Sequence, residues 1–335
     1  MPGQPAISIL LPTHNDVRFL PEAIQSILGQ THADLELVVV DDGSTDQTAA
    51  YLRSLADPRV RVIRLDTNRG ITAALNAGLA ECRGKYVARM DADDIAEPDR
   101  LRRQSEFLEA NRDIGIVGSS RLLIDEQGKP IAPAPAMTDD LSIRWKCLLG
   151  NPLAHPTVML RREIFVGYDL NYRSAQDYEL WTRLLPLTRA ANLAEPLLRY
   201  RIRPSSISRS RQAEQLANHD RIALLANRRL LPSFPLTAEQ ITQLRGRYGG
   251  QSVRDEAMDP ADSEWIGLLE QMLSAFARIY ASHAGIDRCV RQQRERIRNL
   301  PRAAGYTAIP ARLRQTPPRS RGGSTSDSGG RSRPE

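Results

Sequence analysis

The alternation of secondary structure is clearest at residues 35–46, which read LELVVVDDGSTD. Leu35 to Val40 is a short apolar run rich in β-branched residues, which predicts a buried strand. The run continues directly into Asp41, Asp42 and Gly43, whose residue types predict a turn at the carboxyl end of that strand. A buried strand that ends in a polar turn and is followed by a helix is the unit from which parallel sheets are built.

The same alternation continues on both sides of this stretch. Further strand-like runs fall at residues 7–11, 60–65, 86–90 and 114–118. Segments with the period of a helix separate them, at residues 21–28, 48–55, 71–82 and 101–110. Pro21 falls in the first turn of its helix, where the missing N–H costs nothing. We therefore predict an α/β fold with an open, mostly parallel sheet and helices on both faces.

The pattern becomes irregular beyond residue 120. We expect a helix near 141–149, a strand at 157–160, a helix at 178–185 and a strand-like run at 197–202. No Ser/Gly-rich linker separates this part from the first, so a single domain is expected over residues 1–205.

The basic charge of the chain is concentrated in its C-terminal part. The formal net charge is +6 over 335 residues, and it divides into −5 for residues 1–198 and +11 for residues 199–335. Residues 206–300 are expected to form a helical, Arg-rich region with an apolar stripe from Trp265 to Tyr280, which fits core or homodimer packing. Residues 301–335 have the composition of a disordered basic tail. This charge is typical of peripheral contact with an anionic membrane, although arginines that merely solvate an outer face are the simpler explanation for any single helix.

Composition and cysteine content exclude several classes of protein. With 41% hydrophobic and 26% charged residues, the chain is neither collagen-like, nor a coiled coil, nor wholly disordered. Its apolar runs are far shorter than the roughly 18 to 20 residues that cross a bilayer, and the N-terminus lacks the basic region of a signal peptide. Cys82, Cys147 and Cys289 are widely spaced and odd in number, so they form neither a disulfide framework nor a metal pair. We expect a cytoplasmic protein.

Acidic clusters follow two strands of the predicted sheet. One spans Asp41 to Asp46 after the second strand, and the other is Asp91-Ala92-Asp93-Asp94 after the fourth. In an open α/β sheet, ligands bind at the carboxyl ends of the strands. Capping of the next helix explains Asp46 but not two adjacent aspartates, so we expect Asp42 to be functional.

The second cluster predicts a divalent cation. Its carboxylates would repel one another without a counter-charge, and Mg²⁺ or Mn²⁺ typically binds one or two carboxylates together with waters and substrate phosphates. If the loop is locally extended, Asp91 and Asp93 project to the same side, because side chains repeat every second residue. The alternative is an acidic loop that caps the helix beginning near Pro98.

Motifs in a recognisable order span about the first 200 residues. They are ISILLPTHN (7–15), VVVDDGSTD (38–46), NRGITAALNAG (68–78), YVARMDADD (86–94), AHPTVMLRR (154–162) and SAQDYELW (174–181). This set resembles the family 2 glycosyltransferases, which have the GT-A nucleotide-diphospho-sugar fold. The ordered combination is far more specific than any one of its motifs.

The resemblance implies roles in binding a nucleotide-sugar donor. Asp42 is expected to accept a hydrogen bond from the uracil N3–H of a UDP-sugar, while Pro12 and Thr13 line the base pocket. Asn15 is counted among the donor-binding residues. Arg69 is placed to meet the diphosphate, with a solvated surface arginine as an equally weighted alternative.

The resemblance also implies the catalytic groups. Asp93 is expected to be the more direct metal ligand and Asp91 a ligand nearer the ribose, with Mn²⁺ or Mg²⁺ as the ion. Asp177 is expected to be the catalytic base, with Glu179 as the alternative base; without the family match, both would be taken as acidic residues favoured in the first turn of a helix. His155 is left unassigned.

The resulting hypothesis is an inverting, metal-dependent glycosyltransferase that uses a UDP- or dTDP-sugar in bacterial surface glycan synthesis. Its acceptor would be a glycan or a lipid-linked molecule. Processive polysaccharide synthases that resemble this domain carry a Gln-x-x-Arg-Trp motif and membrane helices. The chain has neither, so addition of one sugar per encounter is expected.

Two other classes of function were weighed against this one. A sugar-1-phosphate nucleotidyltransferase would have a Gly-rich basic loop after the first strand, where this chain reads PTHND. A non-catalytic protein that binds nucleic acid or a membrane surface would act through the basic C-terminal region. The aromatic residues there, Trp265, Phe276 and Tyr280, fall on the apolar stripe and are expected to be buried rather than stacked on bases, so no nucleic-acid partner is expected.

Overall fold

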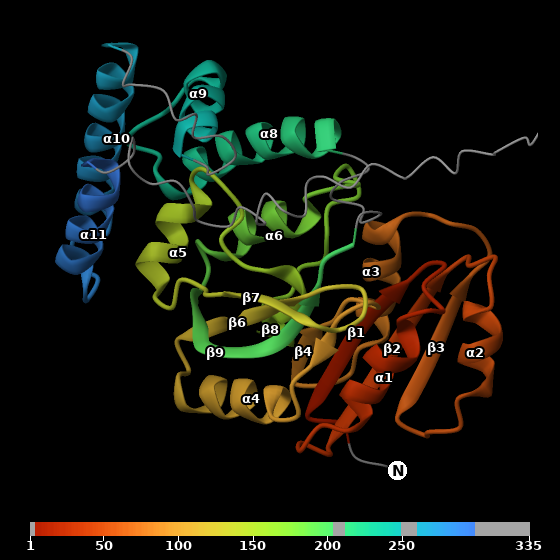
Figure 1. Cartoon of the computed structure of the whole chain (residues 1–335). Coiled ribbons are helices and arrows are strands. Elements are labelled where there is room, and N and C mark those ends of the chain that lie inside the picture. Colours follow the sequence, from red (N-terminus) through yellow and green to blue (C-terminus); the bar gives the residue numbers. More distant parts are fainter. Residues whose placement is uncertain (1–3, 204–211, 249–259, 299–335) are drawn as a thin grey trace, which may run out of the picture.

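The computed structural model describes residues 4–203, 212–248 and 260–298. The tail expected at 301–335 lies outside the described residues. Figure 1 shows one open, twisted sheet with helices on both of its faces, and further helices from the C-terminal part of the chain beyond one of these faces. The predicted α/β architecture with a helical C-terminal region is confirmed.

The first half of the sheet is parallel. It consists of β1 (Ile7–Thr13), β2 (Leu35–Asp42), β3 (Val60–Leu65) and β4 (Tyr86–Arg89), in the spatial order β3-β2-β1-β4. The register pairs Thr13 with Asp41, so β1 and β2 end side by side. The residues that follow these strands therefore share one edge of the sheet.

The second half of the sheet is mixed. Its strands are β5 (Ile95–Ala96), β6 (Ile114–Ile124), β7 (Pro130–Ala134), β8 (Met159–Arg161) and β9 (Arg189–Arg201). β6 pairs with β9 in parallel, whereas β8 lies antiparallel between β4 and β6. The strand expected at 114–118 continues to Ile124, because the polar pair Ser119 and Ser120 stays within the pairing with β9.

Helices cover both faces of the sheet because the strands are buried on both sides. Successive residues of β1 alternate between two cores, with Ile9 and Leu11 on one face and Leu10 on the other. The first core is closed by α1 (Leu20–Leu28), α2 (Thr48–Ser54) and α4 (Arg100–Ala110). The second is closed by α3 (Ile71–Glu81), α5 (Asp140–Cys147) and α6 (Gln176–Leu184). In Figure 1, α4 lies below the sheet and α5 and α6 lie above it.

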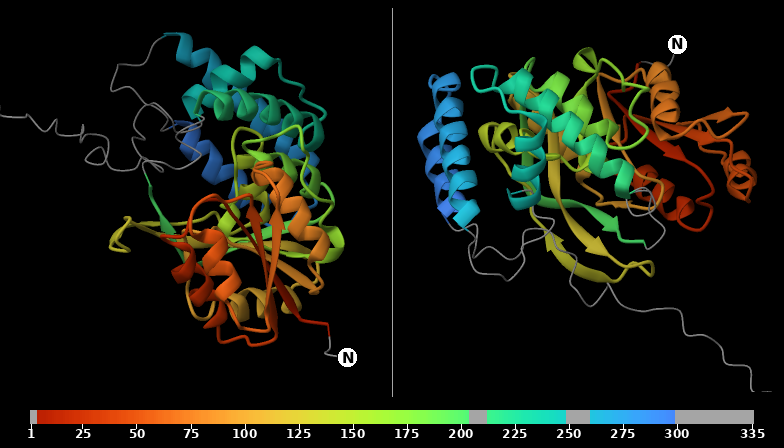
Figure 2. Two further views of the ribbon diagram at one scale, coloured as in Figure 1. Left: turned by 90° about the vertical axis from the view of Figure 1, so that its right-hand side faces the viewer. Right: turned by 90° about the horizontal axis from the view of Figure 1, so that it is seen from above.

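The C-terminal helices extend the second core. They are α8 (Gln212–Leu230), α9 (Ala238–Tyr248), α10 (Pro260–Ile279) and α11 (Ile286–Arg298), and Figure 2 shows them gathered on one side of the sheet. Phe276, in the predicted apolar stripe, packs edge-on against Trp145 of α5 with ring centroids 5.5 Å apart. This part of the stripe thus packs within the chain, and the homodimer stays a prediction.

The domain boundary at residue 205 stays a prediction. No helix in the described ranges has the length and apolar character needed to cross a bilayer.

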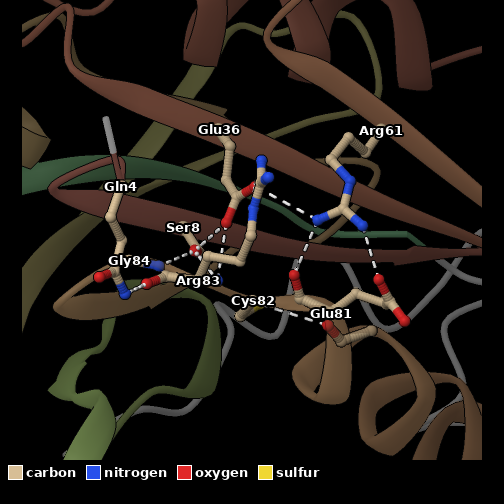
Figure 3. A network of polar contacts seen from close by, with 9 residues as sticks. Gln4, Ser8, Glu36, Arg61, Glu81, Cys82, Arg83 and Gly84 are labelled. Atoms are coloured by element: carbon tan, nitrogen blue, oxygen red, sulfur yellow. Dashed lines mark hydrogen bonds and ion pairs between the residues drawn. The ribbon is translucent and has the colours of Figure 1, made fainter. Parts of the chain in front are cut away.

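A buried polar network ties the strands together at the end of the sheet where β1 and β2 begin (Figure 3). Glu36 is only 4% exposed and accepts hydrogen bonds from the Ser8 hydroxyl at 2.6 Å and from Arg83 Nη2 at 2.7 Å. Burial opposes ionisation of this carboxyl, but the hydrogen bonds from Arg83 and Ser8 outweigh it and lower the pKa of Glu36. The Gly84 N–H also donates to Ser8, at 2.8 Å. The network fixes the turn before β4. The candidate site lies at the opposite end of these strands.

Candidate active site

The carboxyl ends of β1, β2 and β4 bring most of the predicted donor-binding residues to one edge of the sheet. Pro12 and Thr13 are the last two residues of β1, and both are buried. The Thr13 hydroxyl has no hydrogen-bond partner among the described residues. Burying a hydroxyl group without a hydrogen bond is energetically unfavourable. The Thr13 hydroxyl is therefore available to form a hydrogen bond with a ligand bound at this edge.

Asp42 organises the start of α3. Its carboxylate accepts hydrogen bonds from two backbone amides, those of Arg69 at 2.7 Å and Gly70 at 2.8 Å. Each carboxylate oxygen can accept a further bond, so this anchoring leaves capacity for a ligand. The Arg69 side chain is exposed, and its backbone rather than its guanidinium meets Asp42. The nucleotide-binding roles expected for both residues stay predictions.

Asn15 holds the loops after β1 and β2 together. It has a positive φ of 54°, and its side-chain oxygen accepts hydrogen bonds from the backbone amides of Thr45 at 2.8 Å and Asp46 at 3.3 Å. Asp46 in turn accepts from the Thr48 amide at 2.9 Å, which is the capping expected from the sequence. The contacts of Asn15 with the protein therefore shape the predicted nucleotide site.

Three carboxylates converge after β4. Asp91, Asp93 and Asp94 each offer an oxygen, and these oxygens lie within 4.8 Å of one another. The backbone forms a turn here rather than the extended segment that we expected, so the turn brings the carboxylates together and also brings in Asp94. Asp94 is 1% exposed, and its Oδ2 has no hydrogen-bond partner within the described ranges. A compact set of hard oxygen donors suits Mg²⁺ or Mn²⁺.

Two arginines supply part of the counter-charge to this acidic cluster. Arg89 forms an ion pair with Asp91. Arg203 places Nε 2.6 Å from Asp93 Oδ2 and donates through Nη1 to Asp16 Oδ1 at 2.7 Å. From the sequence we expected a bound divalent ion to supply this counter-charge, and these two arginines were not expected.

The arginines do not fully offset the negative charge of the cluster. Burial and, after it, the nearby charge of Asp91 raise the pKa of Asp93 to about 6, although Arg203 opposes the shift. The pKa of Asp94 is also raised, by burial and then by the charges of Asp93 and Asp91. The acidic cluster therefore retains uncompensated negative charge, which would favour the binding of a cation.

Asp177 lies in the first turn of α6, and its side chain has one hydrogen-bonded side-chain partner among the described residues. Asn151 Nδ2 donates to Asp177 Oδ2 at 2.6 Å. Burial raises the pKa of Asp177, against the hydrogen bond from Asn151 and the charge of Arg89. Because Arg89 also pairs with Asp91, this one guanidinium lies near both the acidic cluster and the predicted base.

The alternative base and the unassigned histidine are both engaged in packing contacts. Glu179 is buried and pairs with Arg183 at 2.9 Å and with Arg229 of α8 at 3.3 Å, so it joins α6 to the C-terminal helices. His155 Nε2 lies 2.8 Å from the Tyr168 hydroxyl. Burial lowers the pKa of His155 well below its usual value, so the ring is neutral at pH 7.

Several residues at this edge escaped the sequence argument. Arg89 lies within the YVARMDADD motif, where an arginine in a buried strand was a usable signal, whereas Asp94 was included in the acidic cluster but not expected as a ligand. Asn151, Asp16 and Arg203 had no local signal, because only long-range contacts bring them to Asp177 and Asp93.

Comparison with known proteins gives a consistent result. Residues 8–166 match the family described as Glycosyl transferase family 2. The chain is 33% identical over 213 residues to the O-antigen biosynthesis glycosyltransferase WbnJ of Escherichia coli, covering 61% of this chain and 82% of that protein.

Solved structures share the fold. TarS residues 1–349 of S. aureus, in complex with UDP-GlcNAc, has a TM-score of 0.58 at 19% identity, covering 88% of this chain and 91% of that one. The mannosyltransferase PcManGT of Pyrobaculum calidifontis, in complex with GDP-Man and Mn²⁺, has a TM-score of 0.54 at 19% identity, covering 89% and 86%.

Proposed function

The chain belongs to glycosyl transferase family 2, and we propose that it moves one sugar from a UDP- or dTDP-sugar to an acceptor hydroxyl, with inversion at the anomeric carbon. The observation that carries this proposal is the convergence of Asp91, Asp93 and Asp94 at the sheet edge where β1 and β2 also end. These three carboxylates would hold Mn²⁺ or Mg²⁺. When bound, the ion would neutralise charge that develops on the departing diphosphate.

In this proposal Asp177 acts as the general base. Its carboxylate takes the proton of the acceptor hydroxyl as the hydroxyl oxygen bonds to the anomeric carbon and the bond to the diphosphate breaks. Asn151 holds one carboxylate oxygen by its 2.6 Å hydrogen bond and so orients the other toward an acceptor. A pKa raised by burial makes Asp177 a stronger base than an exposed aspartate.

The donor would lie across the ends of β1 and β2. The unpartnered Thr13 hydroxyl and the remaining acceptor capacity of Asp42 would recognise the base, next to Pro12 and the loop held by Asn15. The exposed Arg69 guanidinium is free to meet the diphosphate. Relatives such as WbnJ act in bacterial polysaccharide biosynthesis, and we propose a surface glycan or lipid-linked acceptor for this chain.

A panel of nucleoside diphosphates tests the proposal. We expect UDP or dTDP to raise the unfolding temperature of the full chain in Mn²⁺, because a ligand at 100 times its Kd adds about 2.7 kcal/mol to the free energy of unfolding. GDP and ADP should give smaller shifts, and excess EDTA should abolish the shift with UDP. An equal UDP shift with and without EDTA would contradict the metal-dependent part, and no shift with any nucleotide would contradict donor binding.

Contact with an anionic membrane is a further part of the proposal. In α11, Arg288, Arg291 and Arg298 are exposed, whereas Cys289 and Ile297 are buried against the neighbouring helices. We expect replacement of these three arginines by glutamine to weaken binding to phosphatidylserine vesicles at least tenfold, since each basic residue near the surface contributes about 1 kcal/mol. Vesicle binding by the wild-type chain should also weaken as salt is raised.

The matched control replaces three exposed arginines on other elements, Arg53, Arg112 and Arg189, by glutamine. Substitution is a cleaner test than truncation before α11, because truncation would uncover the apolar residues of α10. Vesicle sedimentation gives the affinities. If both triple variants lose vesicle affinity equally, or if the wild-type chain does not bind vesicles, the arginines of α11 serve solubility rather than membrane binding.

A further inference from the structure

One arginine is in contact with a carboxylate of the acidic cluster that would hold a divalent ion. Arg203, just beyond β9, lies between Asp16 of the loop after β1 and Asp93 of the acidic cluster. Its Nε is 2.6 Å from Asp93 Oδ2, and its Nη1 is 2.7 Å from Asp16 Oδ1. The guanidinium also lies over the Phe19 ring, 5.3 Å from the centroid.

The two arginines of the cluster differ in how firmly they are enclosed. Arg89 is a residue of β4 and its side chain is 3% exposed, so it is part of the packed interior. The Arg203 side chain is 20% exposed, and its ion-pair partners in the described part of the chain are the two aspartates. Arg203 can therefore leave the cluster with less disturbance to the core than Arg89 could.

Arg203 and a divalent ion would compete for the carboxylate of Asp93. Mg²⁺ binds carboxylate oxygens at about 2.0–2.1 Å, closer than the guanidinium now lies. Two cations on one carboxylate oxygen repel each other strongly where water is largely excluded. An ion that binds Asp93 is therefore expected to weaken or replace the contact with the arginine.

We propose that Arg203 is the resident counter-cation of the acidic cluster and that a divalent ion gains Asp93 by displacing its guanidinium. This inference rests on the metal site of the proposed function. It adds that, in the nucleotide-free protein, the positive charge of Arg203 lowers the affinity of the acidic cluster for a free divalent ion. The matched comparison is with Arg199, an exposed arginine on β9 that pairs with Glu97 outside the cluster.

Direct titration of the full chain with Mn²⁺, without nucleotide, tests the inference. The signal of free Mn²⁺ in electron paramagnetic resonance gives the affinity. We expect Arg203→Gln to bind Mn²⁺ at least about tenfold more tightly than wild type, because one competing unit charge is removed. Arg203→Lys should fall between the two, since a single ammonium group keeps the charge but cannot bridge both aspartates as the guanidinium does. Arg199→Gln should match wild type.

The possible failures are distinguishable. Adding Asp93→Ala to Arg203→Gln should remove the gain, which assigns the tighter binding to the cluster. Equal Mn²⁺ affinity in wild type, Arg203→Lys and Arg203→Gln, with weaker binding in Asp93→Ala, would overturn the inference and leave the metal site standing. No Mn²⁺ binding by any of these chains, with or without UDP, would overturn the metal site itself. If thermal unfolding shows that Arg203→Gln does not fold, Arg203→Lys decides the outcome: tighter binding than wild type supports the inference and equal binding overturns it.

Discussion

Asp177→Asn should lower the rate of sugar transfer by about 10²–10⁴-fold, the usual contribution of a positioned general base. Asparagine keeps the size of the side chain and can still accept the hydrogen bond from Asn151, but it cannot take a proton from the acceptor. Because Asp177 is proposed to act on the acceptor, UDP affinity should stay within about twofold of wild type. Single-turnover transfer and a separate UDP titration measure the two effects.

Two controls accompany this variant. Asp113→Asn changes an exposed aspartate outside the site and should leave the transfer rate unchanged. Glu179→Gln should lower the unfolding temperature rather than the chemical step, because Glu179 holds ion pairs to Arg183 and Arg229. Transfer that survives in Asp177→Asn and is lost in a folded Glu179→Gln would show that the base has been misassigned.

The role of Asp177 as general base also predicts how the transfer rate changes at low pH. Asp177 must be ionised to accept a proton, and burial raises its pKa. The transfer rate should therefore fall as pH decreases through a value above that of an ordinary aspartate, and this acid limb should be missing from the residual activity of Asp177→Asn.

Asp93→Ala should remove the gain in UDP affinity that Mn²⁺ provides, a loss that we expect to be at least about tenfold, because a hard cation held by few carboxylates has little else to bind it. The affinity of the variant in Mn²⁺ should match that of the wild type in EDTA. Isothermal titration of the full chain with UDP, with and without EDTA, measures both. Asp99→Ala is the matched control, since Asp99 is exposed and pairs with Arg102 at the start of α4.

A different pattern would contradict the role of Asp93. If Asp93→Ala still binds UDP more tightly in Mn²⁺ than in EDTA, the ion is held by Asp91, Asp94 or other groups. If Asp99→Ala loses affinity as well, the loss in Asp93→Ala reflects the fold of the loop rather than a metal ligand.

The sequence by itself determined the parallel half of the sheet and the residues at its edge. The apolar run from Leu35 to Val40 predicted β2. The carboxyl end of β2 could be located because Asp41 and Asp42 follow this run directly. Helix periodicity placed α1, with Pro21 in its first turn, and α3 to within a residue or so of their observed bounds. These features are local, since burial on both faces and turn chemistry are written in neighbouring residues.

The tertiary structure alone decided which distant groups meet. The mixed pairing of β6, β8 and β9 follows from long-range register, which no local pattern reports. The same holds for the contacts of Arg203 with Asp93 and of Asn151 with Asp177. A carboxylate motif can be read from the chain, but its counter-charge can come from any arginine that the fold brings within a few ångströms. The electrostatic balance of the site is therefore a property of the assembled sheet edge.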